Sequence, residues 1–241
     1  MAMRLDKLLA HYGIGTRKEV KTYIRKGYVQ VNGQIIKKDD FKVDYEKDQI
    51  LFDGQPINYK PYVYLMLNKP SGYVSATKDN VHPTVVDLIK GYHQYDLFPV
   101  GRLDLDTEGL LLLTNDGDFA NMIMHPRSHL EKIYEVTIKG LIKGEDLHHL
   151  EKGVYLEGKK TMPCKIKVTY KDMEHKTTVL KIKLYEGKNR QVKKMFESVG
   201  HPVKRLHRIS VGCVNLKGLR PGEYRRLKPQ EVKDLKKLVG K

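Results

Sequence analysis

The hydrophobic positions near the start of the chain recur at the spacing of an amphipathic helix. Residues 16–27 place their apolar side chains on one side, and the shorter cluster at residues 5–9 has the same spacing. Thr16 and Glu19 have the spacing of a capping box, and Gly27 is placed to end the second helix. The pattern therefore predicts two short helices within the first 27 residues.

The pattern then changes to the alternation of strands. Val29 and Val31 alternate with polar residues before Asn32-Gly33, a pair typical of a two-residue hairpin turn. Residues 165–170 and 178–185 alternate in the same way around a charged turn. Strands so close in sequence favour an antiparallel α+β fold over βαβ winding. Helices are expected at residues 85–90, 118–124 and 145–152, and in the basic segment near residue 191.

A polar stretch, DGQPINYKPY at residues 53–62, contains two prolines and indicates a connector. We therefore expect a small helix-helix-hairpin domain at residues 1–59. A larger domain with a mixed, largely antiparallel sheet and flanking helices should follow at residues 60–241.

Composition excludes several classes of protein. The longest apolar runs, residues 62–67 and 110–113, are too short to cross a bilayer, and the first residues lack the apolar core of a signal peptide. Cys164 and Cys213 are the two cysteines of the chain, too few for a disulfide framework. The expected protein is soluble and cytoplasmic, without a membrane partner.

Positive charge is concentrated at the two ends of the chain. Residues 187–241 contain 16 basic and 4 acidic residues, and residues 1–60 contain 12 and 8, whereas the segment between them is balanced. The formal net charge is +16. Because phosphate contacts supply most sequence-independent affinity for nucleic acid, this distribution modestly favours a polyanionic partner over a merely basic surface.

The segment GRLDLDTEG at residues 101–109 is acidic and precedes a short apolar run. From Asp104 it imitates the start of an EF-hand loop, but the twelfth position is Asn115 and not a bidentate Glu. A metal held by Asp104 and Asp106 stays open, although no P-loop or dinucleotide motif accompanies the pair. A turn closed by residues 106–109 accounts for Asp106 but leaves Arg102 and Asp104 without a purpose.

Two stretches resemble known families. MRLDKLLAHYGIGTRKEVKTYIRKGYVQVNG is similar to the S-four-type RNA-binding domain. GRLDLDTEGLLLLTNDG resembles the signature of RNA pseudouridine synthases, in the branch that contains RsuA and its large-subunit relatives. LNKPSGYVSA, KIYEV, EGKNRQVKKMF and VKRLHRISVG follow the further motifs of that family in order. Together the two resemblances cover essentially the whole chain.

The second resemblance implies a catalytic role for Asp104 and not for Asp106. It implies an active-site tyrosine at Tyr134 and a basic partner at Lys193, where relatives more often carry Arg, so that Arg190 competes for this role. Pseudouridine formation involves no redox step and no transfer to a second molecule, so we expect no cofactor and no metal. The RNA contacts expected from the resemblances and from charge are Arg4, Arg17, Lys18, Lys21, Arg25, Arg102, Arg190, Lys204, Arg205 and Arg208.

The implied function is the isomerisation of one uridine in ribosomal RNA by a monomeric enzyme. Residues 76–88 look more like the small-subunit enzymes, and no long basic tail follows the last motif, so the expected substrate is small-subunit (16S) RNA in a precursor particle. The alternatives are the same reaction on large-subunit (23S) RNA, a non-catalytic RNA-binding assembly factor, and a metal-dependent sugar or phosphate transferase.

Overall fold

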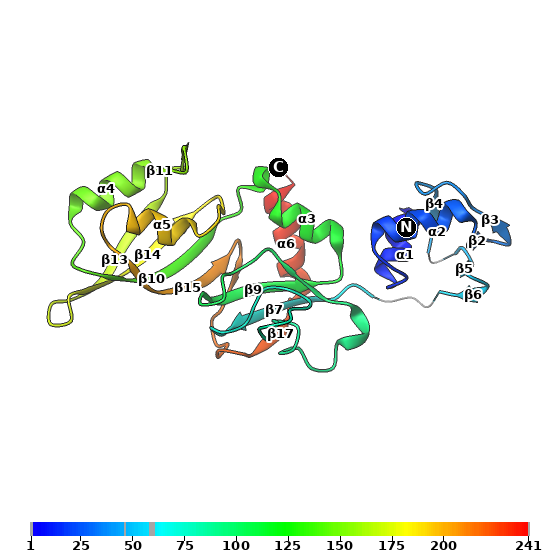
Figure 1. Cartoon of the computed structure of the whole chain (residues 1–241), viewed down its shortest axis with the longest axis horizontal. Coiled ribbons are helices and arrows are strands. Elements are labelled where there is room, and N and C mark those ends of the chain that lie inside the picture. The colour runs from blue at the N-terminus through cyan, green and yellow to red at the C-terminus, as the bar shows by residue number, and fades with distance from the viewer. Residues whose placement is uncertain (1, 46, 58–60, 241) are drawn as a thin grey trace. The chain divides into compact units, whose positions relative to one another are not determined.

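The computed structural model describes residues 2–45, 47–57 and 61–240 of the chain (Figure 1). These residues form two compact units. The first contains residues up to Tyr62, together with Gln94–Asp96 and Asn115–Gly117, and the second contains the remainder. The predicted domain boundary between residues 59 and 60 lies outside the described residues.

The first unit is the predicted helix-helix-hairpin module. Thr16 Oγ1 accepts from the Glu19 amide and Glu19 accepts from the Thr16 amide, so the capping box is confirmed, and Gly27 ends the helix in the left-handed region. Asn32 and Gly33 both have positive φ, as the hairpin turn requires. Its elements are β1 (Ala2–Arg4), α1 (Leu5–His11), α2 (Arg17–Lys26), β2 (Val29–Val31), β3 (Gln34–Ile35), β4 (Lys42–Asp44), β5 (Ile50–Phe52) and β6 (Gln55–Pro56).

Part of the predicted connector is in fact regular structure. Gln55 and Pro56 form β6, which pairs with β5 across an Asp53-Gly54 turn. Pro56 is tolerated because β6 is the edge strand of the order β3-β2-β5-β6. The polar composition of the predicted connector therefore reflects the turn of the β5–β6 hairpin as well as a linker.

The second unit is built on one mixed sheet, which confirms the predicted α+β class. The strands follow the order β13-β14-β10-β15-β9-β7-β17, with β16 beside β15 and β8 beside β9. Every pairing is antiparallel except that of β15 with β9. The strands of this sheet are β7 (Tyr64–Lys69), β8 (Phe98–Val100), β9 (Glu108–Thr114), β10 (Lys132–Lys139), β13 (Lys165–Asp172), β14 (Thr177–Leu184), β15 (Val203–Val211), β16 (Val214–Asn215) and β17 (Tyr224–Arg226). A separate two-stranded sheet is formed by β11 (Tyr155–Leu156) and β12 (Lys159–Lys160).

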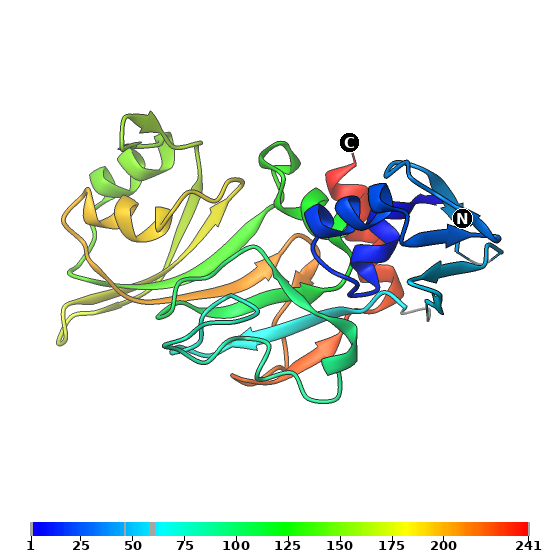
Figure 2. The ribbon, with the colours of Figure 1, turned by 45° about the vertical axis from the view of Figure 1, so that its right-hand side comes forward.

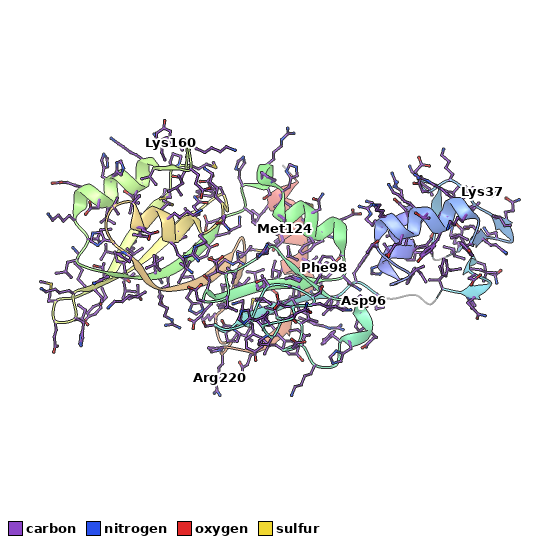
Figure 3. All side chains as sticks on the ribbon, viewed as in Figure 1. Lys37, Asp96, Phe98, Met124, Lys160 and Arg220 are labelled. Atoms are coloured by element: carbon purple, nitrogen blue, oxygen red, sulfur yellow. The ribbon has the colours of Figure 1, made fainter. Side chains whose placement is uncertain are left out.

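Helices pack on the sheet through their apolar sides. Phe119 of α3 and Leu235 of α6 join one buried cluster with Met66 and Leu112, and Phe98 packs against it (Figure 3). In both ribbon views α4 and α5 lie together on one side of β10, β13 and β14 (Figures 1 and 2). The helices are α3 (Gly117–Met124), α4 (Gly144–Lys152), α5 (Gln191–Glu197) and α6 (Pro229–Val239), with short 3-10 turns at His93–Tyr95 and Pro126–Ser128.

In the second unit, three helix predictions are confirmed and one is wrong. The expected helix at residues 85–90 is a series of turns, in which the Asp87 amide bonds to Thr84 and the Ile89 amide to Val86. Six residues are too few to offset helix nucleation, and the Asp87 carboxylate caps Thr84 instead. Helix α6 was not among the predicted helices. None of the helices in the described ranges is long and apolar enough to span a membrane.

Candidate active site

The acidic loop between β8 and β9 is held by its backbone. Gly101, with φ +80°, opens it, and the Thr107 amide donates to the Asp104 carbonyl across a tight turn. The Ser75 hydroxyl accepts from the Leu103 amide at 3.0 Å and donates to the Leu103 carbonyl at 2.9 Å. Ser75 thus holds both the N–H and the C=O of Leu103, the residue before Asp104, which limits where the Asp104 carboxylate can point.

The buried side chain of Lys69 binds the backbone of the same loop. Lys69, at the end of β7, is 0% exposed, and its Nζ lies 3.1 Å from the Asp104 carbonyl, 3.2 Å from that of Leu105 and 2.7 Å from that of Thr107. The Pro70 carbonyl is a fourth acceptor at 3.2 Å. A buried ammonium is stable only when such acceptors replace its water.

The charge of Lys69 persists at neutral pH. Burial lowers its pKa to about 8, and the nearby carboxylates of Asp106, Asp104 and Glu108 oppose that shift. Lys69 lies in the LNKPSG segment but was not among the predicted site residues. Its position directly before Pro70, at the end of an apolar strand, was the available signal.

Lys193 joins the loop from α5. Its Nζ lies 3.5 Å from Asp104 Oδ2 and 2.5 Å from Asp106 Oδ1, so one ammonium serves both carboxylates. The Lys193 side chain is 11% exposed, Asp104 34% and Asp106 66%, which makes Asp104 the better shielded carboxylate. The hydrogen bond from Lys193 lowers the pKa of Asp106 against the opposite effect of partial burial.

The geometry separates the two basic residues that competed for Asp104. Arg190 is exposed at the start of α5, in the left-handed region with φ 49°. Within the described part of the chain the ion pair to Asp104 comes from Lys193 and none from Arg190. Arg190 acts on the loop only through its charge near Asp106, whose pKa it helps to lower.

Tyr134 and Lys69 belong to one row across the sheet. Tyr134 of β10 pairs with Arg208 of β15, Arg208 with Gly109 of β9, and Gly109 with Lys69 of β7. Residues opposed in register share a face of the sheet, so Tyr134 faces the side from which Lys69 holds the acidic loop. Tyr134 is 9% exposed and shares its buried side with Val136, as the alternation predicted.

Gly109 permits the close approach of β9 to β15. A Cβ at this position would lie 2.3 Å from the Arg208 carbonyl oxygen, and the φ of +110° is itself unfavourable for other residues. The parallel ladder has only two residue pairs, Glu108 with His207 and Gly109 with Arg208. This short contact joins the half of the sheet that carries Tyr134 to the half that carries the loop.

Two of the predicted RNA contacts in the first unit share one buried carboxylate as their partner. Arg4 Nε and Nη2 donate to the two oxygens of Asp6 at 2.9 and 3.0 Å, and Lys21 lies 3.9 Å from the same carboxylate. Asp6 is 0% exposed. Burial alone would raise its pKa, but the hydrogen bonds and charge of Arg4 hold that pKa below its ordinary value. Both cations therefore stabilise the buried carboxylate.

The remaining cations of α2 are exposed. Arg17 and Lys18 lie in its first turn, and Arg25 pairs with Asp39 at 2.8 Å while staying two-thirds exposed. Their exposure is compatible with the predicted contacts to RNA.

The predicted contacts in the second unit divide in a similar way. Arg102 and Lys204 are exposed, and Arg205 pairs with Glu108 at 2.8 Å. Arg208 departs from the prediction of a surface phosphate contact, because it is 6% exposed and its Nε donates to the Leu110 carbonyl at 2.7 Å. Charge alone could not distinguish an arginine on the inner side of β15 from one on its outer side.

The described residues contain no group of three or more His, Cys, Asp or Glu side chains that could hold a metal ion. Asp104 and Asp106 instead share the Lys193 ammonium. A carboxylate that is half-shielded, paired with a cation and fixed by its backbone can act as a nucleophile or stabilise a developing positive charge.

Comparison with known proteins places this arrangement in a family. A model described as RNA pseudouridylate synthase matches residues 63–198, and one described as S4 domain matches residues 3–50. The chain is 46% identical to an uncharacterised RNA pseudouridine synthase of Bacillus subtilis, over 95% of this chain and 97% of the relative. A solved pseudouridylate synthase is 33% identical, with a TM-score of 0.66 over 97% of this chain and 99% of the other.

The relatives whose names state a ribosomal subunit include both large-subunit and small-subunit enzymes. The ribosomal large subunit pseudouridine synthase B of Bacillus subtilis is 42% identical, over 98% of this chain and 96% of the relative. The ribosomal small subunit pseudouridine synthase A of Escherichia coli is 38% identical, over 95% and 98%. The chain therefore belongs to the RNA pseudouridine synthases, a family of isomerases, and carries an S4 domain before its catalytic part.

Proposed function

We propose that this enzyme converts one uridine of small-subunit ribosomal RNA into pseudouridine, with Asp104 as the catalytic carboxylate. The observation that carries the assignment of Asp104 is its ion pair with Lys193 at 3.5 Å, on a loop held by Lys69 and Ser75. Asp106 lies nearer to the ammonium but is two-thirds exposed, so it is the less shielded of the two.

The reaction needs a carboxylate beside the anomeric carbon of the target nucleotide. The bond between C1′ and N1 breaks, the uracil turns, C5 joins C1′, the proton that C5 carried leaves, and N1 takes up a proton. Asp104 either attacks the substrate or stabilises the positive charge that develops on the sugar. The Lys193 ammonium lies 3.5 Å from Asp104 Oδ2, where it can orient the carboxylate toward the substrate.

Tyr134 is proposed to contact the detached base. Its ring lies on the inner side of β10, in the row that ends at Lys69. An aromatic ring offers a stacking surface, and a phenol can donate or accept the proton that moves when C5 replaces N1.

A uridine inside folded RNA must leave its stack to reach the loop, at a cost of a few kcal/mol. Arg102 is exposed two residues before Asp104, where its guanidinium can hold the extruded nucleotide. Exposed cations of α2 and Lys204 are proposed to hold the surrounding phosphates.

The choice of ribosomal subunit rests on residues 76–88, which resemble the small-subunit enzymes. The large subunit is the second candidate, favoured by the 42% identity to the synthase B of Bacillus subtilis. Chain length does not separate the two, because that relative matches this chain over 96% of its own length. We propose that the enzyme acts as a monomer on a precursor particle of the small ribosomal subunit.

The test is tritium release from RNA labelled at uridine C5, with and without EDTA. Small- and large-subunit RNA are supplied separately, both free and in immature particles. We expect release from small-subunit RNA by the parent, none by Asp104→Asn, and activity within about tenfold of the parent for Asp106→Asn, a loss of at most about 1.4 kcal/mol in transition-state binding.

Each alternative gives a different result. Release from large-subunit RNA alone would move the substrate to the second candidate. Loss of activity in EDTA would indicate a metal-dependent reaction. RNA binding with no release from any substrate would refute the enzymatic assignment and leave an RNA-binding assembly factor. An inactive Asp106→Asn beside an active Asp104→Asn would reverse the roles of the two carboxylates.

A further inference from the structure

Among the described residues of the second unit, no helix lies on one side of β10, β13 and β14. In both ribbon views α4 and α5 lie on the same side of β10, β13 and β14, and the opposite side of these strands is bare (Figures 1 and 2). The inner side holds buried residues such as Leu180 and Ile182. The side chains that alternate with them therefore point from the bare side into solvent.

Four lysines gather on this bare side, and we call them the lysine patch: Lys165 and Lys167 of β13, and Lys181 and Lys183 of β14. Lys165 is directly opposite Lys183, and Lys167 is directly opposite Lys181. Directly opposed residues have Cβ atoms about 5 Å apart, and like charges at that separation destabilise a sheet. Two such pairs side by side are unfavourable for the isolated protein.

Neighbouring carboxylates offset the positive charge of the two β14 lysines of the patch but not that of the two β13 lysines. Glu131 pairs with Lys183 at 2.8 Å, and Glu135 of β10 is opposite Lys181. For Lys165 and Lys167 no ion pair is formed within the ranges that the structure describes. A lysine on an edge strand can serve to prevent edge-to-edge pairing, and β13 is such a strand. That purpose does not account for the two lysines of β14, which is paired on both sides.

A β-bulge adds an aromatic side chain to the same side. The register of β13 shifts between Val168 and Tyr170, so that Tyr170 faces Val179. Without the shift, the alternation would turn Tyr170 to the inner side, where Leu180 is buried. With it, Tyr170 is 60% exposed on the bare side, next to the lysine patch.

Lysines beside an exposed aromatic ring are the combination that binds single-stranded nucleic acid. The ammonium groups contact the phosphates, and the ring stacks on a base whatever its sequence. Lys165 and Lys167 are two residues apart, which places them about 6.8 Å from one another along the strand. An acidic protein surface would use the charges but has no need of the ring.

We infer that the lysine patch and Tyr170 form a second RNA-binding surface, on the side of the sheet opposite to Tyr134, which holds a single-stranded segment of the substrate outside the active site. The inference rests on the proposed function in that the RNA bound here belongs to the molecule being modified. The surface takes phosphates and one unpaired base, without reading sequence.

The test measures the affinity of the full chain for ribosomal RNA as a function of salt. The double variant Lys165→Gln/Lys167→Gln should reduce the magnitude of the slope of log K against log salt by about 1.4, because each lost contact with single-stranded RNA removes about 0.7. The control is Lys233→Gln/Lys237→Gln on the exposed side of α6, which removes the same charge elsewhere. Tyr170→Ala should weaken binding about tenfold and leave the slope unchanged.

Thermal unfolding and tritium release complete the test. The Lys165/Lys167 variant should be at least as stable as the parent, because opposed like charges have been removed. It should keep its rate at saturating RNA while its KM rises. If both patch variants bind RNA like the α6 control while the parent releases tritium, the inference is overturned and the proposed function stands. If the patch variants lose affinity while the parent releases no tritium, the surface stands and the proposed function fails.

Discussion

Lys69 is the residue whose replacement tests the structure of the active site most directly. Its ammonium carries three protons and lies within hydrogen-bonding distance of four carbonyls, three of them from the loop that contains Asp104. A hydrogen bond from a charged donor contributes about 1.5–3 kcal/mol. Lys69→Met removes all of them while keeping a side chain of similar length.

The net loss is smaller than the sum of these bonds. The variant no longer buries a charge, and the same desolvation that lowers the pKa of Lys69 to about 8 is relieved. We expect the free energy of unfolding to fall by about 2–4 kcal/mol. A displacement of the loop by about 1 Å would reduce kcat/KM by about 100-fold.

Lys132 provides a matched control within the same domain. Burial also lowers its pKa to about 8, with a further contribution from the charge of Arg208. Its Nζ, however, donates to a single carbonyl, that of Leu130 at 3.0 Å, and does not touch the acidic loop. Lys132→Met should therefore be close to the parent in stability and in activity. Urea unfolding and tritium release measure both quantities, and equal losses in the two variants would refute the role given to Lys69.

Three further changes test other parts of the site. Lys193→Met should lower kcat by at least about 100-fold with KM little changed, and Lys193→Arg should recover part of it, since both cations can pair with Asp104; an unchanged kcat in the methionine variant would argue against the ion pair. Gly109→Ala should lower the melting temperature, because its Cβ would lie 2.3 Å from a backbone oxygen and the residue would also be strained by about 1–3 kcal/mol; calorimetry showing an unchanged transition would contradict this. The folded state releases the Lys132 proton near pH 8, whereas the unfolded chain releases it near pH 10.4. The stability of the parent relative to Lys132→Met should therefore increase between pH 8 and 10. A constant difference in stability over that range would contradict the lowered pKa of Lys132.

Local features of the fold were predictable because their causes are local. The capping box of Thr16 and Glu19 and the turn at Asn32-Gly33 each depend on residues at most three positions apart. The prediction of a helix at residues 85–90 relied on the burial of its apolar residues, and burial alone does not require a helix. Its apolar residues Val85 and Ile89 are indeed buried, but turns achieve that burial without a helix.

The resemblances supplied what local patterns could not. They singled out Asp104, Tyr134 and Lys193 before any distance was known. The structure brings Lys193 to Asp104, although 88 residues separate them in the chain. Lys69 was missed because a lysine at the end of a strand is usually solvated, and only the three-dimensional fold reveals the four carbonyls around it. The buried position of Arg208 likewise depends on which side of β15 faces Tyr134.

The two halves of the sheet carry different parts of the proposed site, and their junction fixes the distance between those parts. Lys69 holds the Asp104 loop to β7, while Tyr134 belongs to β10, two strands beyond β9. The halves meet through the two-residue ladder at Gly109, where the backbones approach too closely for any side chain. A Cβ there must move β15 away from β9, and Tyr134 moves with β15 because the two strands are paired along most of their length. A change at Gly109 should therefore separate Tyr134 from Asp104 and impair catalysis even in molecules that remain folded.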